Sequence, residues 1–203
     1  MEIDAAIKAP MEDPDWVKKC AITGLICLIP FAGVLNLLGW QREYARNRLN
    51  GRSDLPEAGL SYIGAGWAVF VSMLPLIGVI IAVSIVGAIL SAILGNIAGP
   101  LALIPALATP LVSLVTGFLG PVFLYRHIVH DDSWAGARVG WAINVARENL
   151  GAVVMLWVIS LVAGFIGGLG YIALLVGVFI TMPLGQAIMA AGIAEFAKAT
   201  NRA

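Results

Sequence analysis

One segment of the sequence combines residue types that could catalyse a reaction or hold a metal ion: His127 and His130, followed by Asp131 and Asp132. Two histidines three residues apart share one face of a helix, and a nearby carboxylate could complete a metal site. The chain has no third histidine. The competing interpretation is a polar boundary where a membrane helix ends and the acids cap the next helix. We expect no catalytic site, metal or cofactor, and therefore no enzyme; metal binding by these four residues is the alternative.

Other motifs carry no recognisable chemistry. The glycine-rich segments 64–66 and 167–170 lack the Lys-Ser/Thr or strand-to-helix context of a phosphate loop. On one helix, Cys20 and Cys27 would have Cα atoms about 10 Å apart, beyond the roughly 7 Å reach of a disulfide. We expect them to pack as small apolar residues. The 12 basic and 12 acidic residues cancel, so no basic excess indicates a nucleic-acid partner.

The composition predicts a membrane protein. Of 203 residues, 60% are hydrophobic and 12% charged, and the mean hydropathy is +0.94; an ordinary soluble domain has about 25% charged residues. Residues 20–41, 58–125 and 149–194 contain no Asp, Glu, Lys or Arg. Because a helix needs about 20 apolar residues to cross the hydrocarbon core, the first stretch can hold one span and the others two each.

The predicted fold class is all-α, a polytopic helical membrane protein with about five spans. Their expected positions are residues 20–41, 76–94, 101–124, 150–166 and 171–193. For residues 20–41 a single crossing is preferred on length. The alternative is a re-entrant pair of short helices that enters and leaves on one face, because Pro30 and Gly33 lie in the middle and proline interrupts helical hydrogen bonding.

Charged residues are confined to residues 1–19, 42–57, 126–148 and 195–203. Basic residues in short loops mark the cytoplasmic side, so we expect these loops and the C-terminus to face the cytoplasm from the cell inner (cytoplasmic) membrane. The side of the N-terminus depends on whether residues 20–41 span. Aromatic and basic residues are expected to anchor the chain at the lipid headgroups: Trp16, Lys18, Lys19, Trp40, Arg42, Arg46, Arg48, Trp67, Trp134, Arg138 and Trp141.

Two acidic segments are predicted to start helices. Asp13 can cap a helix that has Pro14 at its first position, and Asp54 to Glu57 can open the following helix in the same way. Two amphipathic helices are expected to lie at the membrane surface. One, residues 60–74, would end at Pro75, and the other, residues 134–147, would follow the cap at Asp131 to Ser133.

The two amphipathic segments have similar sequences, and each precedes a hairpin. Residues 1–203 are therefore expected to form a single membrane domain with an internal repeat, residues 53–128 and 131–203. Chance similarity among common membrane residues is the alternative.

The sequence also resembles an uncharacterised prokaryotic membrane family, a domain of unknown function. The resemblance rests on Asp13-Pro14-Asp15-Trp16, Leu28-Ile29-Pro30, the Gly39-Trp40 helix exit with its arginines, and Gly51 through Leu55-Pro56-Glu57. The segment from Tyr125-Arg126 to Ser133 and the final hairpin are similar too. The resemblance implies a single-domain protein of a prokaryotic inner membrane and brings no activity or site residues.

We expect a non-enzymatic membrane protein that acts as a homo-oligomeric scaffold or membrane-shaping component, with membrane lipids as its partners. Small residues recur every four positions and would let helices of one or several copies pack closely: Gly87, Ser91, Gly95; Ser113, Gly117; Ser160, Gly164 and Gly168. The alternative is a passive channel or carrier, or the membrane subunit of a transporter. Ion-coupled transport is not expected, because the spans carry no ionised residue.

Overall fold

A computed structural model describes residues 2–170 and 177–200, which contain helices and loops and no strand. Four helical segments are long and apolar enough to cross a membrane: Ile63–Ile97, Gly99–His130, Leu150–Leu169 and Val178–Ala199. The all-α, multi-pass membrane class is thereby confirmed. Of the five predicted spans, the first is not among these four.

Residues 20–41 form a short hairpin and no continuous span. After α1 (Ile3–Lys8) and the 3-10 turn η1 (Ala9–Glu12), α2 covers Trp16–Ile26 and α3 covers Ala32–Leu49. The chain turns at Pro30 and Phe31, and Phe31 has a positive φ of 64°. The single crossing was therefore wrong, and the helix break of the re-entrant alternative is confirmed.

Helix α4 runs without a break from Ile63 to Ala98 and contains Pro75. The prediction of a separate surface helix ending at Pro75 was wrong. Proline has no amide hydrogen, but the loss of one helical hydrogen bond does not stop the helix here. The predicted helix start at Asp54 to Glu57 was also wrong: residues 52–60 form a loop, and α4 begins at Ile63.

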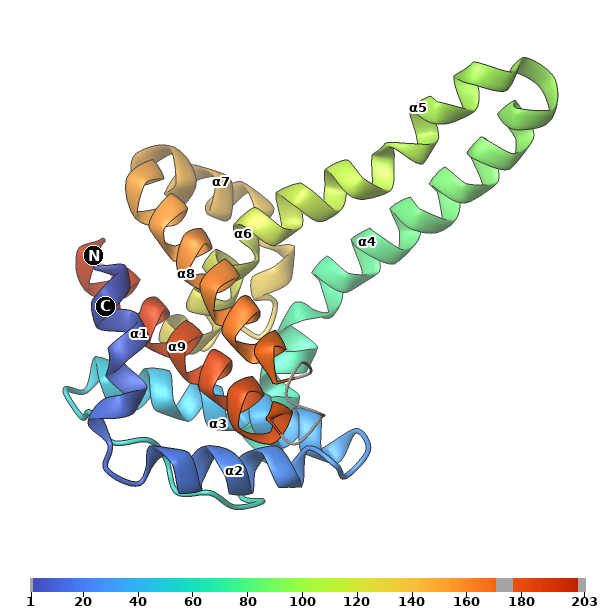
Figure 1. The fold of residues 1–203 in the computed structure, drawn as a ribbon. Helices are drawn as coiled ribbons and strands as arrows, with labels where there is room; N and C mark the ends of the chain where they lie inside the picture. Colours follow the sequence, from blue (N-terminus) through green and yellow to red (C-terminus); the bar gives the residue numbers. More distant parts are fainter. Residues whose placement is uncertain (1, 171–176, 201–203) are drawn as a thin grey trace.

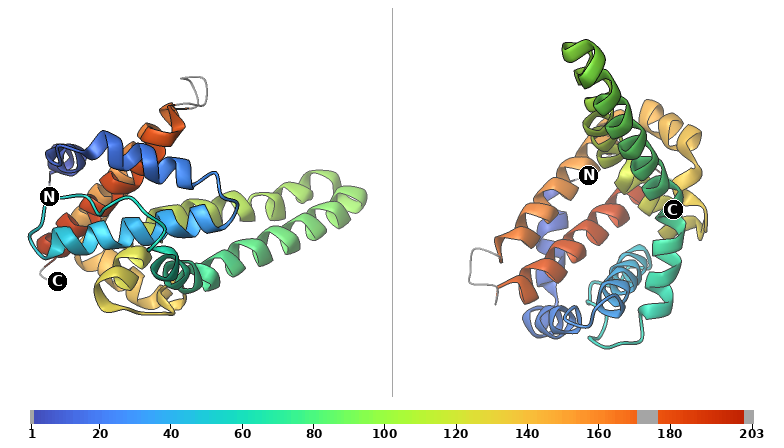
Figure 2. Two further views of the ribbon diagram at one scale, coloured as in Figure 1. Left: turned by 90° about the horizontal axis from the view of Figure 1, so that it is seen from below. Right: turned by 90° about the vertical axis from the view of Figure 1, so that its right-hand side faces the viewer.

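The return from α4 is interrupted, whereas the sequence predicted one span over residues 101–124. It consists of η2 (Gly99–Ala102), α5 (Leu103–Ala106) and α6 (Ala108–His130). Figures 1 and 2 show that the outer part of α4, η2, α5 and the first half of α6 extend far from the other helices. We call this extension, residues 76–118, the arm.

After α6, η3 (Ala135–Ala137) and α7 (Val139–Glu148) lead into the final hairpin of α8 (Leu150–Leu169) and α9 (Val178–Ala199). The second predicted amphipathic helix thus starts later than expected, at Val139. The predicted final hairpin is confirmed, although the expected start of its last span at residue 171 lies outside the described residues. The internal repeat stays a prediction.

Glycines allow the helices outside the arm, which we call the body, to touch through their backbones. A Cβ at Gly66 of α4 would lie 1.6 Å from the Leu35 carbonyl oxygen of α3, and one at Gly24 of α2 would lie 1.9 Å from the Phe179 carbonyl oxygen of α9. Large side chains fill the space between the helices, and Trp40, Tyr44 and Phe196 are fully buried. The short hairpin is therefore held between α4 and α9.

The outer ends of the hairpins lie away from the two termini. In Figure 1 the α2–α3 turn lies at the lower right, the outer ends of α8 and α9 lie near the lower centre, and the tip of the arm lies at the upper right. The ends that carry charge, such as the C-terminal part of α3 with Arg46 and Arg48 and that of α9 with Lys198, are the opposite ends of these helices. This arrangement gives the molecule one charged end and one apolar end.

Candidate functional site

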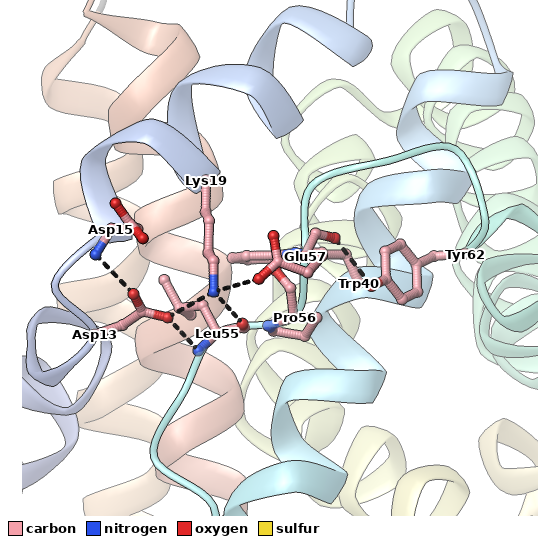
Figure 3. Close-up of polar contacts among 8 residues, drawn as sticks. All are labelled: Asp13, Asp15, Lys19, Trp40, Leu55, Pro56, Glu57 and Tyr62. Atoms are coloured by element: carbon pink, nitrogen blue, oxygen red, sulfur yellow. Dashed lines mark hydrogen bonds and ion pairs between the residues drawn. The ribbon is translucent and has the colours of Figure 1, made fainter.

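A buried polar cluster lies where α2 begins, at the base of the short hairpin. We call Asp13, Lys19, Leu55, Pro56 and Glu57 the polar clamp (Figure 3). Its first part is a turn before α2, in which Asp13 Oδ1 accepts a 2.8 Å hydrogen bond from the Asp15 amide. Asp13 therefore shapes the entry to α2, although α2 starts at Trp16 and no side chain caps it.

Lys19 is the centre of the polar clamp. Its ammonium group lies 3.0 Å from Asp13 Oδ2, 3.0 Å from the Leu55 carbonyl oxygen and 3.0 Å from Glu57 Oε1. Asp13 Oδ2 also accepts a 2.8 Å hydrogen bond from the Leu55 amide. Because an ammonium group has three donors, all of them are used. One lysine thus joins the segment before α2 to the loop after α3.

Side chains of α3 fix the same loop from the other side. Trp40 Nε1 donates a 3.0 Å hydrogen bond to the Pro56 carbonyl oxygen, and Asn36 Nδ2 donates a 2.8 Å bond to the Gly59 carbonyl oxygen. Tyr62 Oη donates to the Glu57 carbonyl oxygen at 2.9 Å. Both legs of the hairpin are therefore tied to residues 55–62.

Burial and hydrogen bonding shift the pKa values of Asp13 and Lys19 in opposite directions. Burial raises the pKa of Asp13, but hydrogen bonds from Lys19 and from the Asp15 and Leu55 amides hold that pKa below its ordinary value. Burial lowers the pKa of Lys19, and its bonds to Glu57 and Asp13 raise it above the ordinary value. Both groups therefore stay charged at neutral pH.

A second ionic cluster joins the loop after α6 to the arginines of α3 and α6. Asp131 pairs with both Arg42 and Arg46. Asp132 Oδ2 lies 2.6 Å from Arg126 Nε and 3.2 Å from Arg138 Nε. The hydrogen bond from Arg126 is the main reason that the pKa of Asp132 falls to about 2.

The sequence singled out His127, His130, Asp131 and Asp132 as a metal-binding alternative. His127 is buried with Nδ1 3.2 Å from the Asp132 carbonyl oxygen, and His130 packs edge-on against aromatic rings. Both carboxylates are engaged by arginines. Within residues 2–170 and 177–200, no group of three or more metal-ligating side chains comes together.

The residues expected as headgroup anchors have different surroundings. Lys18, Trp67 and Trp134 are exposed and Trp16 is half-buried, whereas Trp40 and Lys19 are buried inside the protein. Arg48 pairs with Glu12, and Arg42, Arg46 and Arg138 belong to the second ionic cluster. The ring of Trp141 is stacked on Tyr125 and covered by the Arg126 guanidinium group, 4.4 Å from the ring centroid.

Sequence reasoning missed the clamp itself. Asp13 was assigned to a helix cap and Lys19 to the lipid headgroups, but both bind a loop some forty residues away in the chain. One signal was available: Leu55-Pro56-Glu57 follows the arginine-rich exit of α3. Pro56 lacks an amide hydrogen, which favours a loop whose carbonyl groups bind other elements.

A family model described as a protein of unknown function (DUF4013) matches residues 22–176. The matched segment contains most of the short hairpin, the arm, α7 and α8, and it begins after Asp13 and Lys19. No curated protein and no solved structure matches the chain. The comparison confirms the resemblance to an uncharacterised family and contributes no activity.

Proposed function

We propose a function for this chain, which belongs to the DUF4013 family of unknown function. It is a non-enzymatic membrane scaffold. It inserts its short hairpin into one leaflet and thereby shapes the membrane. The observation that carries this proposal is the length of α2. Its 11 residues measure about 16 Å, whereas the hydrocarbon core is about 30 Å thick. With its charged base at the headgroups, the hairpin reaches about the middle of the bilayer.

The outer surface of the short hairpin is suited to lipid. Val17, Leu25, Leu28, Phe31 and Val34 are large, apolar and between 46% and 63% exposed. An apolar surface of this kind is normally covered by lipid or a partner. Since the hairpin ends near the bilayer centre, the volume that it adds is confined to one leaflet. Shallow insertions of this kind bind in a curvature-sensitive manner.

Contacts at both ends fix the depth of the hairpin. At the base, the polar clamp binds Lys19 to the loop after α3. At the tip, the Phe31 ring lies 6.4 Å from that of Trp67 and 6.2 Å from that of Phe70, both on α4. These contacts support an insertion whose depth is set by the body of the protein.

We further propose that several copies assemble in the membrane. The arm is apolar and packs little against its own chain: only 6% of the most apolar stretch of α4 is buried. Helices in lipid associate through small residues, and most assemblies of identical chains are closed and symmetric. Several inserted hairpins in a ring or array would bend the membrane more than a single copy would.

The test is reconstitution into phosphatidylcholine vesicles, with their shape recorded by electron cryomicroscopy. The wild type is expected to produce tubes or small, highly curved vesicles. Leu25→Gln with Leu28→Gln, at the hairpin tip, should reduce this effect because the tip becomes polar. Leu161→Gln with Phe165→Gln, on the exposed side of α8, is the matched control and should retain it.

Smooth spherical vesicles with the wild type would contradict the shaping role. Mass measurement in nanodiscs tests the assembly separately. A strict monomer would contradict the scaffold of several copies.

A further inference from the structure

A cleft of about 520 Å³ lies between α6, α8 and α9. Gly117 and Pro121 of α6 form one wall, and α8 contributes a row of small residues. The lining from these two helices and α9 is completed by Ser160, Ala163, Gly164, Gly167, Gly168, Met182, Gly185, Gln186 and Met189. All three helices belong to candidate membrane spans, so this cleft lies within the part of the protein that faces lipid.

One side chain in the lining of this cleft has no hydrogen-bond partner among the described residues, and one helical carbonyl lacks its usual partner. The carboxamide of Gln186 makes no hydrogen bond with any described residue, although it is only partly exposed. The second group is the Gly117 carbonyl. Residue 121 is a proline without an amide hydrogen, so the usual helical hydrogen bond to this oxygen cannot form. The lining of the cleft therefore offers donors and acceptors of hydrogen bonds.

Lipid chains cannot satisfy these groups. A polar group left without a partner in hydrocarbon costs several kcal/mol, so an occupant that forms hydrogen bonds is favoured over an acyl chain. No ionised residue lines the cleft, which disfavours a charged occupant. The volume corresponds to on the order of fifteen water molecules at about 30 Å³ each.

A second cleft, in the arm, has an entirely apolar lining. It measures about 640 Å³ between α4 and the interrupted return, and all its walls are Ala, Val, Leu, Ile, Gly or Pro. An apolar space of this type excludes water and suits hydrocarbon. The difference between the two clefts is therefore chemical and not a matter of size.

We propose that the cleft between α6, α8 and α9 is a hydrated site that binds a small uncharged molecule able to donate and accept hydrogen bonds. Gln186 supplies donors and an acceptor, and the Gly117 carbonyl supplies a second acceptor. The small residues of α8 leave the space open. This site is independent of the short hairpin, so its test does not depend on membrane shaping.

The test uses cysteine labelling in reconstituted vesicles, on a background of Cys20→Ala and Cys27→Ala. Gly164→Cys places a thiol in the cleft, where a Cβ at Gly164 meets no atom within 4 Å. Leu161→Cys is the control on the same helix, at a side chain that is 52% exposed to lipid. A charged methanethiosulfonate reagent reacts with the thiolate, which forms only where water is present.

The thiol at position 164 should react at least about tenfold faster than the one at position 161. A thiol surrounded by lipid has a higher pKa, and one pKa unit reduces its thiolate fraction about tenfold. Glycerol, used as the uncharged probe, should slow the reaction at position 164 only. Adding Gln186→Leu should remove this protection by glycerol.

Equal rates at positions 164 and 161 would overturn the proposal, because the cleft would then be dry and filled by lipid or by a second copy. A fast reaction that glycerol does not slow would also overturn it, because water alone would occupy the cleft. Protection that persists in Gln186→Leu would exclude the assigned role of Gln186.

Discussion

The short hairpin and the arm start from the same kind of sequence, a charge-free stretch with a proline inside it. The short hairpin folds back at Pro30 and is bound by the polar clamp, by α4 and by α9. Helix α4 is 36 residues long and continues through Pro75, and its most apolar stretch is only 6% buried. Long-range contacts at the base and sides, and not the proline, therefore distinguish the short hairpin from the long helix.

Burial shows the same contrast among the spans themselves. In the most apolar stretch of α9, 61% of the residues are buried, against 6% in α4. Helix α9 supports α2 and α8 through close backbone contacts, such as Gly185 with the Ala163 carbonyl oxygen. The body thus has a protein-packed core, whereas the arm is little covered by its own chain.

The largest expected effect comes from breaking the clamp with Lys19→Met. The change leaves the buried Asp13 carboxylate without its ammonium partner, and removing one partner of a buried ion pair costs about 3 kcal/mol or more. Thermal unfolding in detergent should show a clear loss of stability. Lys18→Met, at the exposed neighbouring position, is the control; an equal loss in both variants would show that the clamp does not hold the hairpin.

The next effect concerns the contact between the hairpin and α4. Gly66→Ala would place a Cβ 1.6 Å from the Leu35 carbonyl oxygen, and overpacking of this kind costs about 2 kcal/mol. Gly64→Ala, on the same helix, meets no atom within 4 Å and should be neutral. The unfolding temperature checks both variants. A stable Gly66→Ala protein would contradict the close packing of α3 on α4.

The second ionic cluster predicts a dependence on pH. The pKa of Asp132 is about 2 in the folded protein, below the model-peptide value of 3.8. The contribution of Asp132 to the free energy of unfolding is therefore about 2 kcal/mol above about pH 4. It is lost as the pH falls through the pKa of the folded protein.

Unfolding measured from pH 5 to pH 2 in the wild type and in Asp132→Asn checks this prediction. The variant should be less stable at pH 5 and should lose less on acidification. Identical pH profiles would contradict the assigned ion pairs with Arg126 and Arg138.

The smallest expected effect comes from the two prolines. If long-range contacts determine where the chain turns, Pro30→Ala and Pro75→Ala should each change stability by no more than about 1 kcal/mol and should leave the helix boundaries in place. Hydrogen exchange of the backbone amides checks this directly. Protection extending continuously from α2 into α3 in Pro30→Ala would show that the proline itself makes the turn.

The sequence predicted the features that depend on local composition. The charge-free stretches 58–125 and 149–194 contain most of each of the four candidate spans, because a helix needs about 20 apolar residues to cross a bilayer. The resemblance of the motifs to an uncharacterised family was also confirmed.

The rest depends on contacts that sequence spacing does not reveal. Pro30 and Pro75 look equivalent in the sequence, yet one lies beside a turn and the other inside a helix. Lys19 and Trp40 have the residue types of headgroup anchors, but each binds the loop at residues 55–57. Asp131 and Asp132 resemble helix caps, but their carboxylates mainly bind arginines from three elements.

The central claim is that residues 20–41 enter and leave the membrane on one face. It is tested most directly by Lys18→Cys and Arg52→Cys, two exposed positions on either side of the hairpin, each in the background without Cys20 and Cys27. A membrane-impermeant thiol reagent is applied to sealed vesicles in which the protein has one orientation. The account predicts that both positions are labelled from the same side; labelling of the two from opposite sides would show a full crossing and contradict it.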